Sequence, residues 1–240
     1  MGEVGVRVSR PAAVRLAPVL LGQGVRVRRR IPVLPEAAGP RAGSVGAGGP
    51  LAPAVLGEST AAGVGVERIE DGLATRLAHE LADRGGRRVG WRVSARTGAT
   101  AREARSELLA AAAAEPSDVA VVVLGVNDTL RLTGRAGWRR DVAAMVAALR
   151  AVQPPDGRVV LAGVPDLGAF PALPRPLRTV LGRHSRALDR ELRALARAPG
   201  VLHAPVPTLT GADALATDGF HPGATSYRDW AAALADRLTP

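Results

Sequence analysis

An apolar run near the middle of the chain gives the clearest pattern of hydrophobic positions. Residues 119–128 read VAVVVLGVND, so five apolar residues from Ala120 to Leu124 precede a glycine and an Asn-Asp pair. An uninterrupted run of this kind is typical of a central strand that is buried on both faces of a parallel sheet. Ligands bind outside the carboxyl ends of the strands in open α/β sheets. Chemistry is therefore expected at Asn127 and Asp128.

Strand-like and helix-like patterns alternate over the rest of the chain. Short apolar segments predict four more strands, at 52–56, 88–93, 158–163 and 201–204. Helical spacing of apolar residues predicts helices at 65–84, 100–114, 138–151, 177–198 and 224–238. Such alternation implies right-handed crossovers and a parallel sheet. We therefore predict a three-layer α/β/α flavodoxin-like sandwich with a five-stranded parallel sheet in the strand order 2-1-3-4-5.

The first part of the chain does not follow this alternation. Its apolar stretch at 14–21 is expected to pack on the domain as a short helix, and the Pro-, Gly- and Ala-rich segment 34–50 is typical of a linker or an irregular wrap. We predict an N-terminal extension over 1–50 and a single domain over 51–240. A tight basic cluster lies within the extension and consists of Arg26, Arg28, Arg29 and Arg30.

Composition and charge exclude several classes of function. The chain has 240 residues and no cysteine, which excludes disulfides, thiol nucleophiles and Cys-based metal sites. Its formal net charge is +10, but it contains no lysine, and its arginines are spread through the predicted helices. A coding bias explains this charge better than a nucleic-acid surface does, so we expect no nucleic-acid partner. The arginine cluster is either a solvated face or a weak peripheral contact to a membrane.

The hydropathy of the chain predicts neither a membrane span nor an export signal. No apolar run reaches the roughly 18 residues that a membrane span needs. The stretch 14–21 contains an arginine and a proline and makes a poor signal peptide. We therefore expect a cytoplasmic protein.

Two loops hold the residue types that nucleophilic catalysis needs. Ser59 follows the first predicted strand in a turn flanked by glycines, where its hydroxyl is raised above the sheet and the next helix offers N–H groups. His221 lies in the loop DGFHPG, three residues after Asp218, a spacing that lets the carboxylate fix the tautomer of the imidazole. Taken alone, Ser59 is better explained as a helix cap, and the Asp-His pair as a turn with a solvated histidine.

Two further residues are candidate donors of hydrogen bonds to a negatively charged oxygen. Asn127 offers a side-chain amide after the central strand, and Gly98 offers a backbone N–H in the loop after the second strand. The alternatives are an Asx turn or helix cap at Asn127 and an ordinary loop glycine at Gly98. The candidate residues occur along the chain in the order serine, glycine, asparagine, and then the Asp-His pair. This order indicates a catalytic site more specifically than any one of the residues does.

In this order the four segments resemble the conserved blocks of the SGNH, or GDSL-like, hydrolases. GESTAAG with Ser59 resembles the first block, the loop at Gly98 the second, GVND with Asn127 the third, and DGFHPG the last. The resemblance covers about residues 51–238. The first block departs from the family at Glu58, where the family usually carries aspartate.

The resemblance implies a mechanism of acyl transfer to water. Ser59 is then the nucleophile, His221 the general base, and Asp218 the residue that orients the histidine. The backbone N–H groups of Ser59 and Gly98 and the amide of Asn127 form the implied oxyanion hole. Neither a metal nor an organic cofactor is required.

The predicted function is hydrolysis of small-molecule carboxylic esters with short to medium acyl chains. We expect the loop 164–176 and the segment 205–217 to line an apolar pocket for the acyl group. Alternatives on the same machinery are a carbohydrate O-deacetylase and a lysophospholipase. A third alternative, which Glu58 favours, is a catalytically inactive hydrolase fold that serves as a binding module.

Overall fold

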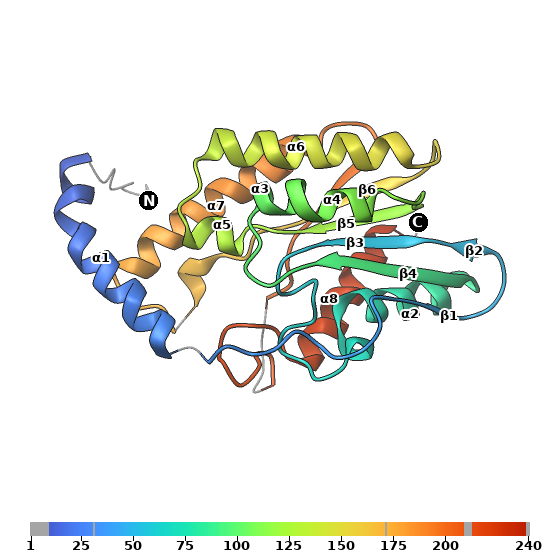
Figure 1. Cartoon of the computed structure of the whole chain (residues 1–240), viewed down its shortest axis with the longest axis horizontal. Coiled ribbons are helices and arrows are strands. Elements are labelled where there is room, and N and C mark those ends of the chain that lie inside the picture. Colours follow the sequence, from blue (N-terminus) through green and yellow to red (C-terminus); the bar gives the residue numbers. More distant parts are fainter. Residues whose placement is uncertain (1–9, 31, 171, 209–212, 239–240) are drawn as a thin grey trace, which may run out of the picture.

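The structure, a computed structural model, describes residues 10–30, 32–170, 172–208 and 213–238. Within these residues a seven-stranded sheet forms the middle layer of a three-layer α/β/α fold (Figure 1). The strands follow the order β1-β4-β3-β5-β6-β7, and β2 pairs with β4 beside this path. The predicted fold class is confirmed.

Five of the strands are the predicted parallel strands. They are β3 (Pro53–Gly57), β4 (Arg88–Ala95), β5 (Val119–Val123), β6 (Arg158–Ala162) and β7 (Val201–Ala204). Their spatial order, β4-β3-β5-β6-β7, is the predicted order 2-1-3-4-5. All of their carboxyl ends therefore meet at one edge of the sheet, where the residues that follow β3, β5 and β6 can share a site.

The predicted sheet was too small by two strands, and both come from the segment predicted as a linker. β1 (Ala42–Val45) pairs antiparallel with β4, and β2 (Pro50–Leu51) pairs parallel with it. The prediction was wrong over these residues because AGSV has little strand propensity of its own. It becomes a strand by hydrogen bonding to the backbone groups along the open edge of β4.

Two helical layers enclose the sheet. α2 (Leu73–Gly85) and α8 (Ala224–Leu238) cover one face, and α6 (Arg135–Val152) and α7 (Leu177–Leu195) cover the other (Figure 1). Every residue of β5 is buried, and successive side chains pack alternately toward the two layers. This two-sided burial explains why β5 is apolar throughout rather than alternating with polar residues.

Two predicted helices are shorter or less regular than the sequence indicates. The helix predicted from residue 65 begins at Leu73, after a series of turns and the short 3-10 helix η1 (Ile69–Asp71). Gly63 and Gly65 have φ values of 77° and 106°, which a right-handed helix does not allow. The helix predicted over 100–114 is divided. It consists of α3 (Ala101–Glu103), the π-helical turn η2 (Ala104–Leu108) and α4 (Leu109–Ala112).

Two short helices have no counterpart among the predictions. α5 (Val126–Leu130) begins directly after Gly125 at the carboxyl end of β5, and η3 (Leu167–Ala169) lies in the loop after β6. Segments of five and three residues are too short to show a helical period. Both lie at the edge of the sheet where chemistry is expected.

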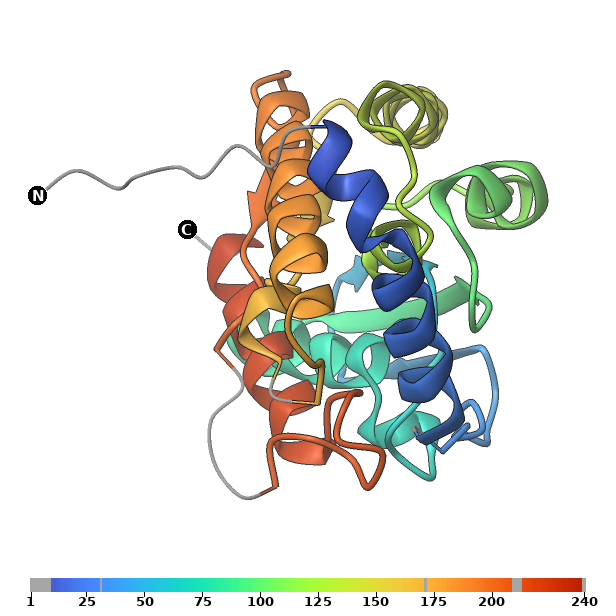
Figure 2. The same cartoon turned by 90° about the vertical axis from the view of Figure 1, so that its left-hand side faces the viewer.

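The N-terminal apolar stretch forms part of a longer helix than predicted. α1 (Arg10–Arg30) packs against the start of α7, where Leu20 and Val27 contact a small apolar cluster. Figure 2 shows α1, in blue, crossing in front of the carboxyl edge of the sheet. Among the described helices, none combines the length and the hydropathy that crossing a bilayer requires.

Candidate active site

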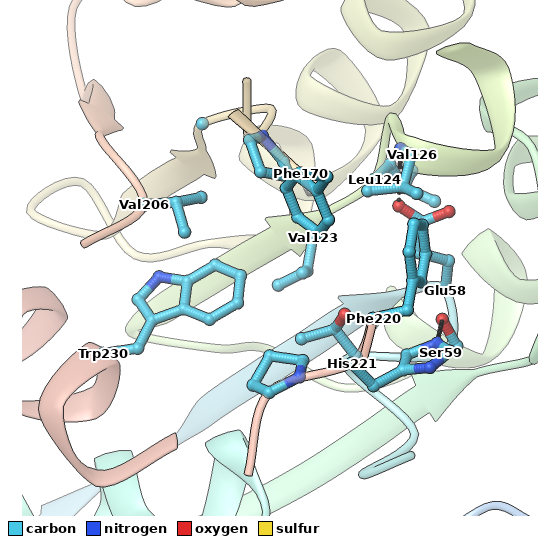
Figure 3. A pocket seen from close by; sticks show the side chains of 14 residues that line it. Glu58, Ser59, Val123, Leu124, Val126, Phe170, Val206, Phe220, His221 and Trp230 are labelled. Carbon is cyan, nitrogen blue, oxygen red and sulfur yellow. Dashed lines mark hydrogen bonds between the residues drawn. The ribbon is translucent and has the colours of Figure 1, made fainter. Parts of the chain in front are cut away.

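The structure brings Ser59, His221 and Asp218 together in one line of hydrogen bonds. Ser59 Oγ lies 2.9 Å from Nε2 of His221 (Figure 3). Nδ1 of the same ring lies 2.6 Å from Oδ2 of Asp218. Because a carboxylate only accepts, Nδ1 carries the proton of the neutral ring and Nε2 is left as the acceptor for the serine hydroxyl. A serine nucleophile needs this tautomer.

The local fold of the DGFHPG loop fixes Asp218 beside the histidine. Its second oxygen, Oδ1, accepts hydrogen bonds from the backbone N–H groups of Phe220 at 2.9 Å and His221 at 3.0 Å. Gly219, between Asp218 and Phe220, has a φ of 65°, which favours glycine at this turn. Burial opposes ionisation of Asp218, but the hydrogen bonds from His221 and Phe220 outweigh it and lower the pKa of the carboxyl. Asp218 is therefore held as the carboxylate.

Ser59 lies in a turn rather than at the start of a helix. The turn is closed by hydrogen bonds from the N–H of Ala62 to the carbonyl of Glu58 and from the N–H of Val64 to the carbonyl of Ser59. The helix cap of α2 is Gly72, so Ser59 caps no helix, and the expected N–H groups of a following helix are not beside it. This part of the prediction was wrong because the turns after Ser59 continue for more than ten residues.

Two backbone donors near this turn are open. Within the described part of the chain, the backbone N–H groups of Ser59 and Gly98 donate to no acceptor. Gly98 has a φ of 81° and has no atoms near the position of an added Cβ. Arg131 Nη2 holds the same residue by its carbonyl at 3.1 Å, which leaves the N–H for a ligand.

The Asn127 amide is occupied in this structure. Its Nδ2 donates to Oε2 of Glu58 at 2.5 Å and to the carbonyl of Ala99 at 3.3 Å. The amide group has two hydrogens, and both are used. An oxyanion can gain this donor only by displacing one acceptor, and the longer bond, to Ala99, is the weaker of the two. The role predicted for Asn127 in the oxyanion hole stays a prediction.

Glu58 connects the serine turn to the start of α5. Its side chain is buried, and its carboxylate also accepts from the backbone N–H groups of Val126 at 2.9 Å and Asn127 at 3.0 Å. These are first-turn N–H groups that have no partner within the helix. Burial raises the pKa of Glu58 to about 7, although the hydrogen bonds from Asn127 and Val126 lower it. Glutamate is one methylene longer than aspartate, and at this length its carboxylate accepts hydrogen bonds from the start of α5.

Asp128, the neighbour of Asn127, has a structural role. It is fully buried, and its Oδ2 accepts from the backbone N–H of Ala101 at 2.8 Å, at the start of α3. Thr100 caps the same helix in a capping box with Glu103. Asp128 therefore holds the end of the loop that contains Gly98 against α5.

A residue of the N-terminal extension also holds this loop. Glu36 Oε1 accepts from the backbone N–H of Thr97 at 2.7 Å and from its hydroxyl at 2.9 Å. Arg41 binds the other oxygen of Glu36 at 2.5 Å. Thr97 directly precedes Gly98, so Glu36 positions an open donor of the site. No sequence signal indicated this contact, because the two segments are 61 residues apart and Glu36 lies in a segment without a motif.

An apolar pocket opens beside Ser59 and His221. The predicted loops contribute Pro165, Phe170 and Val206 to its wall. Residues 171 and 209–212 of those loops lie outside the described residues. Sequence reasoning missed the deeper wall, which comes from the end of β5 and from α8 and includes Val123, Leu124 and Trp230. Figure 3 shows Val206 and Trp230 on the side of the pocket away from Ser59.

The structure contains a second His-Asp pair, and among the described residues no serine joins its hydrogen bonds. Nε2 of His203 lies 2.8 Å from Oδ1 of Asp189, which also accepts from the backbone N–H of Val164 at 3.1 Å. Arg193 binds the other oxygen of Asp189. This pair fixes the start of the loop after β6 through the bond from Val164 to Asp189.

Comparison with known proteins shows which family of sequences this chain matches. The model of the GDSL-like Lipase/Acylhydrolase family matches residues 55–237. A GDSL-like esterase of Mycobacterium tuberculosis is 31% identical over 182 residues, which are 72% of this chain and 57% of that protein. The chain thus spans little more than half the length of this relative.

Solved structures share the fold at low sequence identity. TesA has a TM-score of 0.63 and 24% identity, over 79% of this chain and 98% of that one. A lipase from a goat rumen metagenome has a TM-score of 0.64 and 18% identity, over 78% and 96%. The psychrotrophic esterase EstA from Pseudoalteromonas sp., in a structure inhibited by monoethylphosphonate, has a TM-score of 0.59 and 16% identity, over 78% and 96%. At these identities the likeness supports the fold alone.

Proposed function

We propose that this chain, which belongs to the GDSL-like lipase/acylhydrolase family, hydrolyses carboxylic esters through a covalent intermediate on Ser59. The family resemblance carried by the four sequence blocks is confirmed by this membership. The observation that carries the catalytic proposal is the hydrogen-bonded line from Ser59 Oγ through His221 to Asp218, with distances of 2.9 Å and 2.6 Å. This is the arrangement in which an imidazole can take the proton of an attacking hydroxyl.

In the first half of the reaction the acyl group moves to the serine. Ser59 Oγ attacks the ester carbonyl carbon while its proton passes to Nε2 of His221, and the carbonyl oxygen becomes an oxyanion. Asp218 stabilises the charged imidazole through Nδ1. When the tetrahedral intermediate collapses, His221 returns the proton to the departing alcohol and Ser59 carries the acyl group. Water then attacks the acyl-enzyme with His221 again as base, which releases the acid and restores the serine.

The two open backbone donors support an oxyanion hole at the serine turn. The N–H of Ser59 belongs to the nucleophile itself, and Gly98 lies in a loop that Glu36 and Asp128 hold in place through its neighbours. Asn127 serves as a third donor when its bond to Ala99 is exchanged for one to the oxyanion. Removal of one such donor typically costs about 2.7–4 kcal/mol of transition-state stabilisation.

The pocket favours an acyl group of short to medium length. The wall beside His221 is aromatic: the rings of Phe170 and Phe220 are 5.3 Å apart between centroids, and Phe220 meets the His221 ring edge-on at 5.5 Å. Val206 and Trp230 close the far side and limit the length of chain that fits. This apolar lining favours acyl chains over the polar face of a sugar, so we place a carbohydrate O-deacetylase second.

Turnover of p-nitrophenyl acetate, butyrate and octanoate by purified variants tests the proposal. We expect Ser59→Ala and His221→Ala to lose measurable turnover, whereas Ser106→Ala, a change at an exposed serine on η2, keeps the wild-type rate. Circular dichroism melts of each variant establish that the fold is retained. Equal turnover by wild-type protein and Ser59→Ala would exclude the proposed mechanism.

A further inference from the structure

The outward face of α1 combines apolar and basic side chains that none of the described residues covers. Val19, Leu21 and Val25 are 47%, 70% and 52% exposed, and Arg26 and Arg29 are exposed beside them. Single exposed apolar residues are common on proteins, but Leu21 and Val25 are four residues apart and therefore lie side by side on the helix surface. We call these five residues the α1 face.

The helix has a separate inward face, so the exposure of the α1 face is not a result of loose packing. Leu20 and Val27 contact the apolar cluster at the start of α7. Gln23, on the same side, donates to the carbonyl of Arg175 at 2.7 Å and accepts from the N–H of Leu177 at 3.1 Å. The spacing 20, 23 and 27 defines one side of a helix, and the α1 face lies on the remaining surface.

The charge of α1 is complementary to an anionic partner. Residues 10–30 include six arginines and no acidic residue. Within the described part of the chain, neither Arg26 nor Arg29 has a carboxylate partner. Arg28 and Arg30 belong to the same helix, and their side chains lie outside the described part of the structure. Helices that lie in a membrane interface carry arginine or lysine on one part of their surface and apolar side chains on another.

The α1 face lies at the same edge of the sheet as the candidate active site. α1 crosses in front of the carboxyl ends of the strands (Figure 2), and Phe170, which lines the pocket, packs against the cluster that holds Leu20 and Val27. Leu130, the last residue of α5, and Leu132, just after it, expose further apolar surface at this edge, 44% and 53%. Leu132 does so with a φ of 53°, a conformation that a leucine rarely adopts.

We infer that the α1 face is a docking surface for a lipid bilayer with anionic headgroups. The arginines bind the headgroups, and Val19, Leu21 and Val25 enter the boundary between headgroups and acyl chains. This contact develops the second of the two alternatives given for the arginine cluster, a peripheral contact to a membrane, rather than a solvated face. It goes beyond ester hydrolysis, because binding to vesicles needs no turnover, and it would place the mouth of the pocket close to the lipid.

Flotation of the full-length protein with vesicles tests the inference. Wild-type protein is expected to float with phosphatidylcholine vesicles that contain phosphatidylglycerol, and to float far less with phosphatidylcholine alone. Each arginine near an anionic surface contributes about a fivefold gain in partitioning, so Arg26→Glu with Arg29→Glu should weaken binding by about 25-fold or more. Leu21→Ser with Val25→Ser should weaken it by about tenfold, since both side chains lose their apolar burial.

A charge-matched double variant separates the α1 face from the overall charge. Arg88→Glu with Arg237→Glu changes two exposed arginines, at the start of β4 and in the last turn of α8, and removes the same amount of charge. This control is expected to bind as the wild type does. An equal loss in the control, or no binding by wild-type protein, would overturn the inference.

A second probe separates a lipid surface from a general site for polyanions. Retention of double-stranded DNA is measured for the same variants, each confirmed as folded by its thermal melt. If the arginine variant loses DNA and vesicle binding alike, while Leu21→Ser with Val25→Ser binds vesicles as the wild type does, the surface binds polyanions and the inference is wrong. Dependence of vesicle binding on both pairs supports it.

Discussion

At the scale of single residues, the glutamate before Ser59 is the most distinctive feature of this chain. From the sequence, Glu58 was only a departure from the aspartate of the family, and it favoured an inactive protein. The structure gives it a defined position, because its carboxylate accepts three hydrogen bonds from Val126 and Asn127. The sequence could not show this contact, since it joins residues 68 and 69 positions apart.

The raised pKa of Glu58 predicts a pH-dependent contribution to stability. Burial raises the pKa of this carboxyl from 4.5 to about 7. Between these values the folded protein holds a proton that the unfolded chain has released, so the free energy of unfolding falls as the pH rises. Relative to Glu58→Gln, the free energy of unfolding of the wild type should fall by about 3 kcal/mol as the pH rises from 4.5 to about 7. Urea unfolding of both proteins at a series of pH values measures the difference, and a difference that is flat or rises with pH contradicts this account.

At the scale of elements, the sequence predicted what has a strong local signal. The five parallel strands and their order follow from apolar runs and the alternation with helices, and the loops with Ser59 and His221 are marked by glycines. The missed elements are short or depend on tertiary contacts: β1 forms against β4, and α5 follows a single unusual glycine. The donors of the candidate site therefore depend partly on elements that have no sequence signature.

Gly125 should be intolerant of a side chain because it sets the direction of α5. It has a φ of 130°, and a Cβ at this position would lie 2.6 Å from Val164 and 3.2 Å from Trp138. We expect Gly125→Ala to lower the free energy of unfolding by about 2–3 kcal/mol and to lower ester turnover, since α5 would shift. Gly134→Ala is the control, because this helix cap has a φ of −62° and no atom near the added Cβ. Urea unfolding should show a change of only a few tenths of a kcal/mol there.

Glu36 should affect the rate of hydrolysis more than substrate binding. It holds Thr97 by two hydrogen bonds and so positions the N–H of Gly98. If Gly98 stabilises the oxyanion, Glu36→Ala should lower kcat by about tenfold and leave KM nearly unchanged, because the bond is made in the transition state. Glu67→Ala, at an exposed glutamate without such a bond, serves as the matched control. A change in KM alone would contradict a positioning role.

At the scale of the whole molecule, segments that are distant in the sequence combine to form the pocket beside Ser59 and His221. The pocket wall joins the end of β5, the loops after β6 and β7, and α8. Sequence reasoning could predict loops at strand ends, but the contribution of α8 depends on how the helical layers pack. The cytoplasmic location, the absence of a nucleic-acid partner and the division of the chain at residue 50 stay predictions.

The length of the accepted acyl chain should respond to the size of Val206. This residue closes the pocket on the side away from Ser59 (Figure 3). We expect Val206→Ala to raise the ratio of kcat/KM for octanoate over acetate by about tenfold, since removed methyl groups leave space for the chain. Val206→Phe should lower the same ratio. If both variants shift the ratio in the same direction, Val206 does not limit the acyl site.

The most direct test of the central claim is mass spectrometry of the protein after reaction with a fluorophosphonate. In this reaction an oxygen–phosphorus bond forms at the serine as the phosphorus–fluorine bond breaks, and the serine proton passes to His221 as fluoride leaves. We predict one adduct, on the peptide that contains Ser59, and its loss in Ser59→Ala. A folded wild-type protein without this adduct, or an adduct at another serine that persists in Ser59→Ala, would contradict the account.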